Sequence, residues 1–515
     1  MDIEEFMLEW SHRRSVDGKS FNELLALDGI PLWWFYNRFF IWHVMPRQIN
    51  TFESIRSGKE LSILQKIKLQ IYPKISKKYI LIKEKRKIKF LRRELKPNHK
   101  PKVLFLTYTN HISGDKLYRI QGIIDKIREK GNIKDIVIFA DPLSSGKYAA
   151  LKDRCNIYQY HTDEIAKKAE EESDRLATQW KQISREQKRK MLWNEMDLWD
   201  YLQYAFNFFF SREFLYITAL YYYIFKEILA KENVRVVLIT SQNSIFEKCL
   251  IAAANKLKIN VLRLQHGIGE EIVGPDQYDI ENKYFYKLVF SDYHKKEAMA
   301  VGWPKEKVIV VGSVVFDHIA KYIASKKKQG KDILLATIPV VQSNLMDEKE
   351  YLRRIMTILK EIKKVNDKVT IKLHPRETPK ERCVSNYIKL LDELGLMNSA
   401  VFGGDVLEEK FYELVEKSDI MVNFGSTVAI EAMIIGRPTV TIDLLGNKFH
   451  TQWIEQQGIT VNVNWDGDIS GAIRKALLND RGIRKRSEEY IKRKCGKING
   501  KAYEKVAKVI ELMSK

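Results

Sequence analysis

Four polar residues follow directly after short apolar runs, each of which predicts a buried strand. They are His266, His374 and the pair Ser426 and Thr427. An imidazole or a hydroxyl in such a place can donate a hydrogen bond to a phosphate oxygen. Open α/β sheets bind their ligands outside the carboxyl ends of the strands. The pattern therefore predicts an anion-binding site built from several strand ends.

The stretch 418–443, SDIMVNFGSTVAIEAMIIGRPTVTID, predicts one βαβ unit. An apolar run is broken at Gly425, and a helix follows that the hydroxyl of Ser426 or Thr427 can cap. Gly436 ends this helix before a second apolar run. The start of such a helix offers unpaired N–H groups and a positive dipole end to a phosphate or diphosphate. A plain connection between two strands is the alternative interpretation.

Strands and helices alternate along two long parts of the chain. Sequential strands joined by crossover helices require parallel sheets with right-handed connections. The expected fold class is therefore α/β, with two doubly wound Rossmann-like domains that face each other across a cleft and an N-terminal basic and aromatic helical extension. We expect strands at 103–107, 136–140, 236–240, 261–265, 288–291 and 308–312, and then at 333–337, 369–373, 400–402, 420–422, 439–442 and 460–463.

Composition and spacing predict four segments. Residues 1–98 form the extension, 99–320 a first Rossmann-like domain with a helical insertion at 163–231, 321–480 a second such domain, and 481–515 a basic helix or helix pair. The charged stretch KYIASKKKQGK marks the boundary between the two domains.

The net charge of +22 is unevenly spread. Residues 59–102 hold sixteen Lys or Arg against three Glu, a net charge of +13, and shortly before them residues 31–46 are dense in Trp and Phe. Aromatic anchors beside a polybasic segment are typical of proteins that rest on an anionic membrane. A small helical subdomain with the Trp residues in its core fits equally. A nucleic-acid footprint is a third interpretation, without any recognised motif.

Cellular location is predicted from three features. The four cysteines are widely spaced and include no CxxC pair, which favours neither disulfides nor zinc and fits a reducing compartment. The amino end is acidic, unlike an export signal, and the apolar run 214–225 is too short to span a bilayer. We expect a cytoplasmic protein that can rest on the inner face of the membrane.

Four motifs together resemble the glycosyltransferase-B (GT-B) superfamily. They are LRLQHG at 262–267, VVGSVVFD at 310–317, IKLHPRE at 371–377 and NFGSTVAIEAMIIGRPTV at 423–440. The nearest members are capsule and teichoic-acid transferases, including CDP-glycerol glycerophosphotransferases and the CMP-Kdo and polysialic-acid transferases. UDP-N-acetylglucosamine 2-epimerases are cousins. The resemblance covers roughly residues 100–480 and is strongest in the second half.

The resemblance implies that the second domain holds the nucleotide of an activated donor. His374 and Arg376 would lie near the phosphates, Gly425, Ser426 and Thr427 would offer donors to them, and Glu431 would hold ribose hydroxyls. A helix-surface acid is the alternative interpretation of Glu431.

The first domain would hold the acceptor and the general base. His266 is the first choice for the base, Asp115 the second, and Glu270 is also near. Asn110, His111 and Ser113 lie in the loop after the first strand, where the acceptor or the transferred group would sit; ordinary loop chemistry explains them too.

We expect a metal-independent glycosyltransferase that moves a sugar from a nucleotide-activated donor to a surface-glycan or lipid-linked acceptor, with no cofactor. No DxD-type acidic pair stands in a suitable place. Two departures separate the chain from its relatives: TNHISGD replaces the arginine-rich turn of the epimerases, and Ser426-Thr427 replaces their Gly-Gly. A glycerophosphotransferase, an epimerase-like enzyme and a non-catalytic nucleic-acid or membrane-binding protein are the alternatives.

Overall fold

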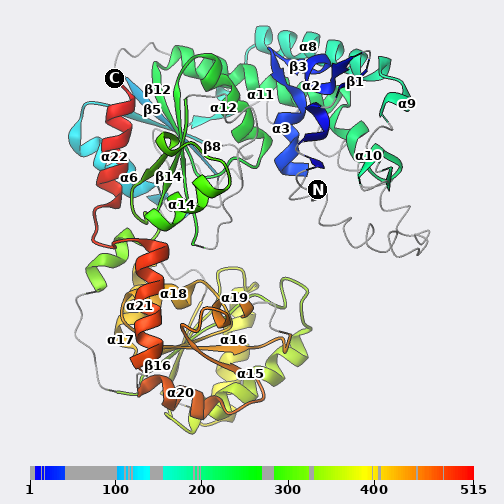
Figure 1. The fold of residues 1–515 in the computed structure, drawn as a ribbon. Coiled ribbons are helices and arrows are strands. Elements are labelled where there is room, and N and C mark those ends of the chain that lie inside the picture. Colours follow the sequence, from blue (N-terminus) through cyan, green and yellow to red (C-terminus); the bar gives the residue numbers. More distant parts are fainter. Residues whose placement is uncertain are drawn as a thin grey trace. The chain divides into compact units, whose positions relative to one another are not determined.

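The structure is a computed structural model of the chain. It describes residues 6–40, 101–139, 155–268, 284–323, 330–403, 408–447, 451–478 and 481–515, apart from short gaps at 8, 13, 17, 109–111, 114–115, 118–119, 189–191, 194–195, 198 and 397. Two compact units form (Figure 1). Unit 1 comprises residues 1–289, 295–309 and 506–515, and unit 2 comprises residues 290–294 and 310–505.

Unit 1 contains a seven-stranded sheet in the order β15-β14-β13-β12-β5-β8-β9. The pairs from β14 through β9 are parallel. In chain order the strands are β5 (Lys102–Thr107), β8 (Lys134–Phe139), β9 (Cys155–Asn156), β12 (Val234–Ile239), β13 (Asn260–Leu264), β14 (Phe285–Val289) and β15 (Val308–Val310).

Three helices lie between strands of this sheet along the chain. They are α6 (Gln121–Lys130) between β5 and β8, α12 (Ile245–Lys256) between β12 and β13, and α14 (Asp292–Ala300) between β14 and β15. From Val506 on, the last helix, α22 (Ala502–Met513), belongs to unit 1, and it lies beside α6 (Figure 1). Lys130 Nζ contacts Glu511 at 2.8 Å, and Asn260 Nδ2 donates to Met513 O at 2.8 Å. The last ten residues of the chain, 506–515, therefore belong to unit 1.

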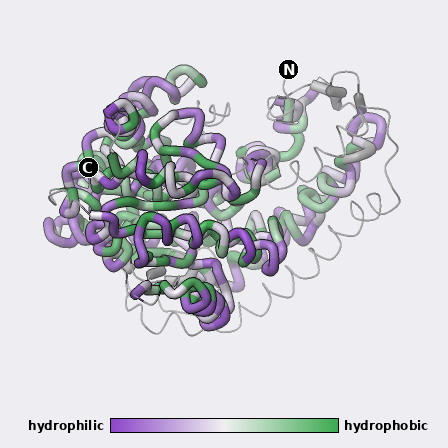
Figure 2. Tube along the Cα trace, turned by 90° about the horizontal axis from the view of Figure 1, so that it is seen from below, coloured by the Kyte–Doolittle hydropathy of each residue, from purple (hydrophilic) through white to green (hydrophobic). Residues whose placement is uncertain are grey.

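An aromatic helical layer packs beside the sheet of unit 1. It contains α2 (Phe21–Leu24), α3 (Leu32–Phe39), α8 (Asp163–Gln182), α9 (Arg185–Lys188), α10 (Trp199–Phe209) and α11 (Arg212–Lys231), with three short strand pairs: β1 (Arg14–Val16) with β2 (Lys19–Ser20), β3 (Ala26–Leu27) with β4 (Ile30–Pro31), and β10 (Leu192–Trp193) with β11 (Met196–Asp197). Helix α11 is buried along most of its length because it contacts α8 on one side and α12 on the other. Figure 2 shows helices whose tubes alternate between purple and green, as expected when one stripe packs inward.

Unit 2 contains a parallel six-stranded sheet in the order β18-β17-β16-β19-β20-β21. In chain order the strands are β16 (Ile333–Ala336), β17 (Val369–Lys372), β18 (Ala400–Phe402), β19 (Ile420–Asn423), β20 (Thr439–Asp443) and β21 (Val461–Asn464). Numbered along the chain, this is the order 3-2-1-4-5-6 of dinucleotide-binding sheets. The expected parallel α/β fold is confirmed, and so is the βαβ unit at 418–443.

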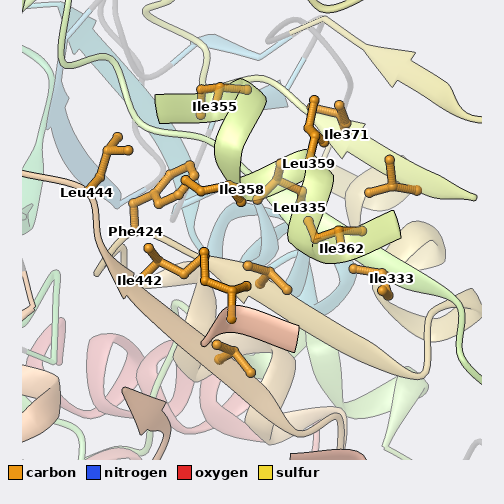
Figure 3. Close-up of a cluster of buried hydrophobic side chains, with 14 of the residues drawn as sticks. Ile333, Leu335, Ile355, Ile358, Leu359, Ile362, Ile371, Phe424, Ile442 and Leu444 are labelled. Carbon is orange, nitrogen blue, oxygen red and sulfur yellow. The ribbon is translucent and has the colours of Figure 1, made fainter. Parts of the chain in front are cut away.

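Two layers of helices cover the sheet of unit 2. On one face, side chains of α15 (Glu348–Lys363), α16 (Lys380–Glu393) and α20 (Ile469–Leu477) form a core with inward residues of the strands. Figure 3 shows Ile355, Ile358, Leu359 and Ile362 of α15 directed at this core. The other face carries α17 (Glu408–Lys417), α18 (Val428–Ile434) and α21 (Arg481–Cys495), as Figure 1 shows. The short α19 (Gln452–Glu455) follows β20.

Most expected strands lie within two or three residues of the observed ones. Residues 112–113 and 116–117 pair as the antiparallel strands β6 and β7, and α6 starts at Gln121. The tail forms two helices, with Gly496 and Gly500 between them at positive φ.

Three further expectations concern the cysteines, a membrane-spanning helix and the basic aromatic segment. Cys249, Cys383 and Cys495 are free thiols. Within the described ranges, no helix combines the length and the apolar character needed to cross a bilayer. Most of the basic segment 59–102 and the aromatic residues after 40 lie outside the described residues.

Candidate functional site

The strand order of unit 2 reverses between β16 and β19, and doubly wound sheets bind ligands at such a reversal. His374 follows β17 and Ser426 follows β19, with β16 between these two strands. Two strand spacings amount to about 10 Å. The two residues therefore lie at the same edge of one sheet, as predicted.

The loop after β17 is held by the buried carboxylate of Glu377. This carboxylate accepts hydrogen bonds from Thr337 Oγ1, from the backbone N–H of His374 at 2.6 Å and from Tyr351 OH at 3.3 Å. Tyr351 OH in turn lies 2.6 Å from Tyr387 OH. Glu377 is only 3 % exposed, and its pKa is raised, because burial disfavours the charged form more than these hydrogen bonds favour it.

The imidazole of His374 has a defined hydrogen-bonding state. The backbone N–H of Arg376 donates to His374 Nδ1 at 3.1 Å, so in the neutral ring the proton sits on Nε2. Burial, together with the positive charges of Lys372 and Arg376, lowers the pKa of His374 to about 4. His374 is therefore a neutral Nε2–H donor at physiological pH.

Positive charge surrounds this imidazole. Lys372, two residues before His374, is half-buried, and its ammonium lies 5.5 Å from the centre of the Phe411 ring of α17. Burial lowers the pKa of Lys372, and the carboxylate of Glu431 acts in the opposite direction. Lys372 and Glu431 therefore interact on the sheet face that carries α17 and α18, while Arg376 is exposed at the loop.

The turn after β19 is fixed by Asn423, which is fully buried. Its amide Nδ2 donates to Val440 O at 3.0 Å, and its Oδ1 accepts from Gly425 N at 2.9 Å. Gly425 has φ +87°, a conformation that side chains with a Cβ rarely adopt. Trp453 of α19 donates from Nε1 to Gly425 O at 3.1 Å. These bonds set the path of the chain into Ser426.

The expected side-chain cap of the helix is wrong. Thr427 is the N-cap residue of α18 in an αR conformation, and neither its hydroxyl nor that of Ser426 caps the helix. Thr427 is exposed and Ser426 is half-buried. A hydroxyl cap needs an extended N-cap residue, and the turn at Gly425 supplies a helical one instead. Helix α18 also has only seven residues, so its dipole is short.

The corresponding edge of unit 1 holds His266. It follows Gln265 beyond β13 and is half-buried. At the strand reversal of this sheet, Tyr108 OH donates to Glu247 Oε1 at 2.6 Å and contacts Ser244 Oγ at 2.9 Å. Glu247 is 1 % exposed, and burial raises its pKa.

Several predicted acceptor-side residues have no described geometry. Asn110, His111, Asp115 and Glu270 lie outside the described residues, and Ser113 is described only by its backbone in β6. Their roles stay predictions.

Sequence reasoning missed Lys372, Glu377 and Thr337 as members of the site. Lys372 and Glu377 stand in the motif IKLHPRE, and a lysine at the end of an apolar run was a usable signal. Nothing in the periodicity marks Glu377 as buried, because loops carry no period.

A hollow of about 290 Å³ lies at the opposite edge of this sheet. Met433, Pro438, Thr439, Ile459 and Arg484 are among its lining residues. Residues 438 and 459 precede β20 and β21, so this hollow belongs to the amino edge and is separate from the His374 loop.

In the part of the chain that the structure describes, no three His, Cys, Asp or Glu side chains gather closely enough to hold a metal ion. The expectation of a metal-independent reaction stays a prediction.

The second half of the chain matches a known family. Residues 286–511 match the family model described as UDP-N-acetylglucosamine 2-epimerase. This match includes the His374 loop and the turn at Gly425, and it confirms the resemblance to the superfamily that the motifs predicted. No curated protein matches the chain.

Solved structures with a similar fold include enzymes of two kinds. One is a UDP-GlcNAc 2-epimerase from Neisseria meningitidis bound to UDP-GlcNAc, with 14% identity and a TM-score of 0.47, over 80% of this chain and 99% of that one. Another is the wall teichoic acid polymerase TagF, with 12% identity and a TM-score of 0.42, over 81% and 90%. A third is a glycosyltransferase from Rickettsia africae, with 12% identity and a TM-score of 0.44, over 81% and 100%.

Proposed function

From the match of residues 286–511 to the epimerase family model, we propose that this chain is an enzyme that binds a nucleotide-activated sugar at the carboxyl edge of the unit 2 sheet. We further propose that it transfers the sugar to an acceptor hydroxyl. The observation that carries the proposal is the group formed by Lys372, His374 and Arg376 at the carboxyl end of β17, the sheet edge that also holds the turn at Gly425.

The chemistry of the bond to be broken explains why these groups suit the reaction. When a bond between a sugar and a phosphate breaks, negative charge develops on the leaving phosphate. Positive groups and hydrogen-bond donors that are already in place stabilise this charge in the transition state. Lys372 and Arg376 supply charge, and His374 supplies a neutral N–H that loses no proton at working pH. Glu431 is proposed to accept hydrogen bonds from ribose hydroxyls, as the resemblance implies.

The acceptor side of the proposal rests on the sequence. His266 is the proposed general base, with Asp115 and Glu270 as alternatives, and a glycan or lipid-linked acceptor is the proposed partner. A metal-independent reaction, a cytoplasmic location and contact with an anionic membrane belong to the same proposal.

Epimerisation of a free nucleotide sugar is the second candidate, because the family model itself describes 2-epimerases. Transfer is favoured because TNHISGD stands where the epimerases have an arginine-rich turn, and because Ser426-Thr427 replaces their Gly-Gly. The two reactions differ in what they need: an epimerase converts its substrate without any acceptor.

Two measurements test the proposal. In a thermal-shift assay with UDP-, CMP-, CDP- and GDP-activated donors, we expect one nucleotide class to raise the Tm of the wild type and to have little effect on His374→Ala. Incubation of the stabilising donor without acceptor, followed by NMR, should show slow hydrolysis under the transfer proposal and a 2-epimer under the second candidate. A rise in Tm with RNA alone, weakened by salt, would instead support a nucleic-acid-binding protein.

A further inference from the structure

Glu377 is a buried acid without a direct place in the proposed chemistry. It is 3 % exposed and borders the core that contains Tyr351 and Tyr387. A carboxyl group costs free energy in such surroundings unless donors surround it. Three donors do so here, the hydroxyls of Thr337 and Tyr351 and the backbone N–H of His374. An apolar residue would fill the same space without this cost, so packing alone does not explain the carboxyl group.

The carboxylate closes a turn of four residues around the imidazole. His374 N–H donates to Glu377 Oε2 at 2.6 Å, and Glu377 N–H donates back to His374 O at 3.0 Å. These two bonds join the ends of the turn. They fix the backbone of His374 relative to Thr337, which follows the central strand β16.

The closed turn also orients the ring. Arg376 lies inside the turn, and its N–H donates to His374 Nδ1 at 3.1 Å. This bond requires that Nδ1 carries no proton, so the remaining ring proton lies on Nε2. A turn that opened would lose this bond, and both neutral tautomers would then be populated.

We propose that Glu377 is a positioning residue, whose carboxylate closes the turn 374–377 and thereby holds His374 with Nδ1 as acceptor and Nε2–H as donor. The role of this donor toward a phosphate rests on the proposed function, whereas the control of the ring by Glu377 does not. Glu377 acts through His374 and the backbone, not by contact with a substrate.

The test follows the ring nitrogens of His374 in the full chain. Protein labelled with ¹⁵N-histidine is studied by NMR at pH 7, and the His374 signals are assigned by their absence in His374→Asn. In the wild type we expect an unprotonated Nδ1 and a protonated Nε2. In Glu377→Ala we expect mixed tautomers. In Glu377→Gln, which keeps one acceptor oxygen, we expect the two ring-nitrogen signals to return toward the wild-type pattern.

Tyr351→Phe is the matched control. It removes a hydrogen bond to the other carboxylate oxygen, Oε1, and leaves the Oε2 bonds to Thr337 and His374 in place. We therefore expect this variant to lose stability while its His374 signals stay as in the wild type. If Glu377→Ala does not fold, Thr337→Val replaces it as the test of the proposal. This variant removes the hydroxyl that is bonded to Glu377 and to His374 N. We expect it to shift the His374 ring signals part of the way toward mixed tautomers.

Unchanged His374 signals in Glu377→Ala, or in Thr337→Val where Ala does not fold, would overturn the proposal. So would an equal change in Tyr351→Phe. With an active donor in hand, Glu377→Ala should lower kcat/KM about 10²-fold, the scale for misplacing a group by about 1 Å. If no donor binds the wild type, the proposed function fails, and the nitrogen signals still decide the role of Glu377.

Discussion

At the scale of single residues, the protonation state of His374 is set by its surroundings. Burial and two neighbouring cations keep the ring neutral, since each of them disfavours a further positive charge. A neutral imidazole can donate to a phosphate oxygen without changing charge during the reaction. Lys372 and Arg376 then supply the positive charge that His374 lacks.

The low pKa of His374 predicts a pH dependence of stability. Its pKa is about 4 in the folded protein, against an ordinary value of 6.5, so the unfolded chain binds this proton first as the pH falls. The corresponding stability is fully present above about pH 6.5 and is lost as the pH falls toward about 4. We expect the urea midpoint of the wild type to fall more steeply over this window than that of His374→Asn. Parallel slopes would contradict the assignment.

Lys372 gives a prediction in which stability and binding change in opposite directions. Its ammonium is partly desolvated, so Lys372→Met should keep or raise the Tm of the free protein, because the stem still packs and the charge is gone. The same variant should reduce the rise in Tm caused by the donor. The control is Lys360→Met, an exposed lysine on α15, which should change neither value. If the donor raised the Tm of the wild type and of Lys372→Met equally, Lys372 would not be part of the binding site.

At the scale of elements, the turn between β19 and α18 is built by hydrogen bonds rather than by a helix cap. Asn423 links Val440 O of β20 to the N–H of Gly425, so one side chain joins the neighbouring strand to the turn. Gly436 ends α18 at φ +87°, and Arg437 then donates to the carbonyls of Val415 and Glu416 at the end of α17. The βαβ unit is thus fixed at both ends of its helix.

Removing the Asn423 side chain should destabilise unit 2. Asn423→Ala leaves the carbonyl and the N–H that it bonds unsatisfied in a buried place, which costs about 1–3 kcal/mol. Urea denaturation should show this loss of unfolding free energy. The exposed Asn398 supplies the control, since Asn398→Ala should change the value by less than about 0.5 kcal/mol. If both variants lowered the free energy of unfolding equally, Asn423 would not be the residue that holds the turn.

At the scale of the whole molecule, the described residues between 6 and 40 are part of unit 1. Trp33 is 2 % exposed, its Nε1 donates to Met7 O at 2.8 Å, and its ring lies 5.1 Å from that of Phe206 in α10. Tyr36 OH donates to Thr218 Oγ1 of α11 at 3.0 Å. For the described residues up to 40, the interpretation as a helical subdomain with a tryptophan core is therefore correct, and Trp33 is not a surface anchor.

Trp33→Ala separates these interpretations in solution. Loss of a buried tryptophan should lower the free energy of unfolding of unit 1 by about 3–5 kcal/mol, with a matching fall in Tm. Leu478, which is 86 % exposed, gives the control, because Leu478→Ala should have almost no effect. If Trp33→Ala left stability intact and weakened binding to anionic vesicles, the membrane interpretation would apply to this segment.

The sequence by itself determined the order of the elements. Apolar runs bounded by Gly, Pro and polar residues placed the strands of both sheets, because a strand buried on both faces needs a continuous apolar run. Right-handed crossovers then required parallel sheets. It also placed His266, His374 and Ser426 at strand ends, because that position follows from where each run stops.

Only the tertiary structure decided what surrounds those residues. Glu377 and Arg376 stand next to each other in the chain, yet one is buried under Thr337 and the other is exposed, and no local pattern distinguishes them. The strand order places β16 between β17 and β19, and this order brings the His374 loop and the Gly425 turn to the same edge, two strand spacings apart. Periodicity fixes which face of a strand a residue occupies, but the element that covers that face is chosen by packing between segments far apart in the chain.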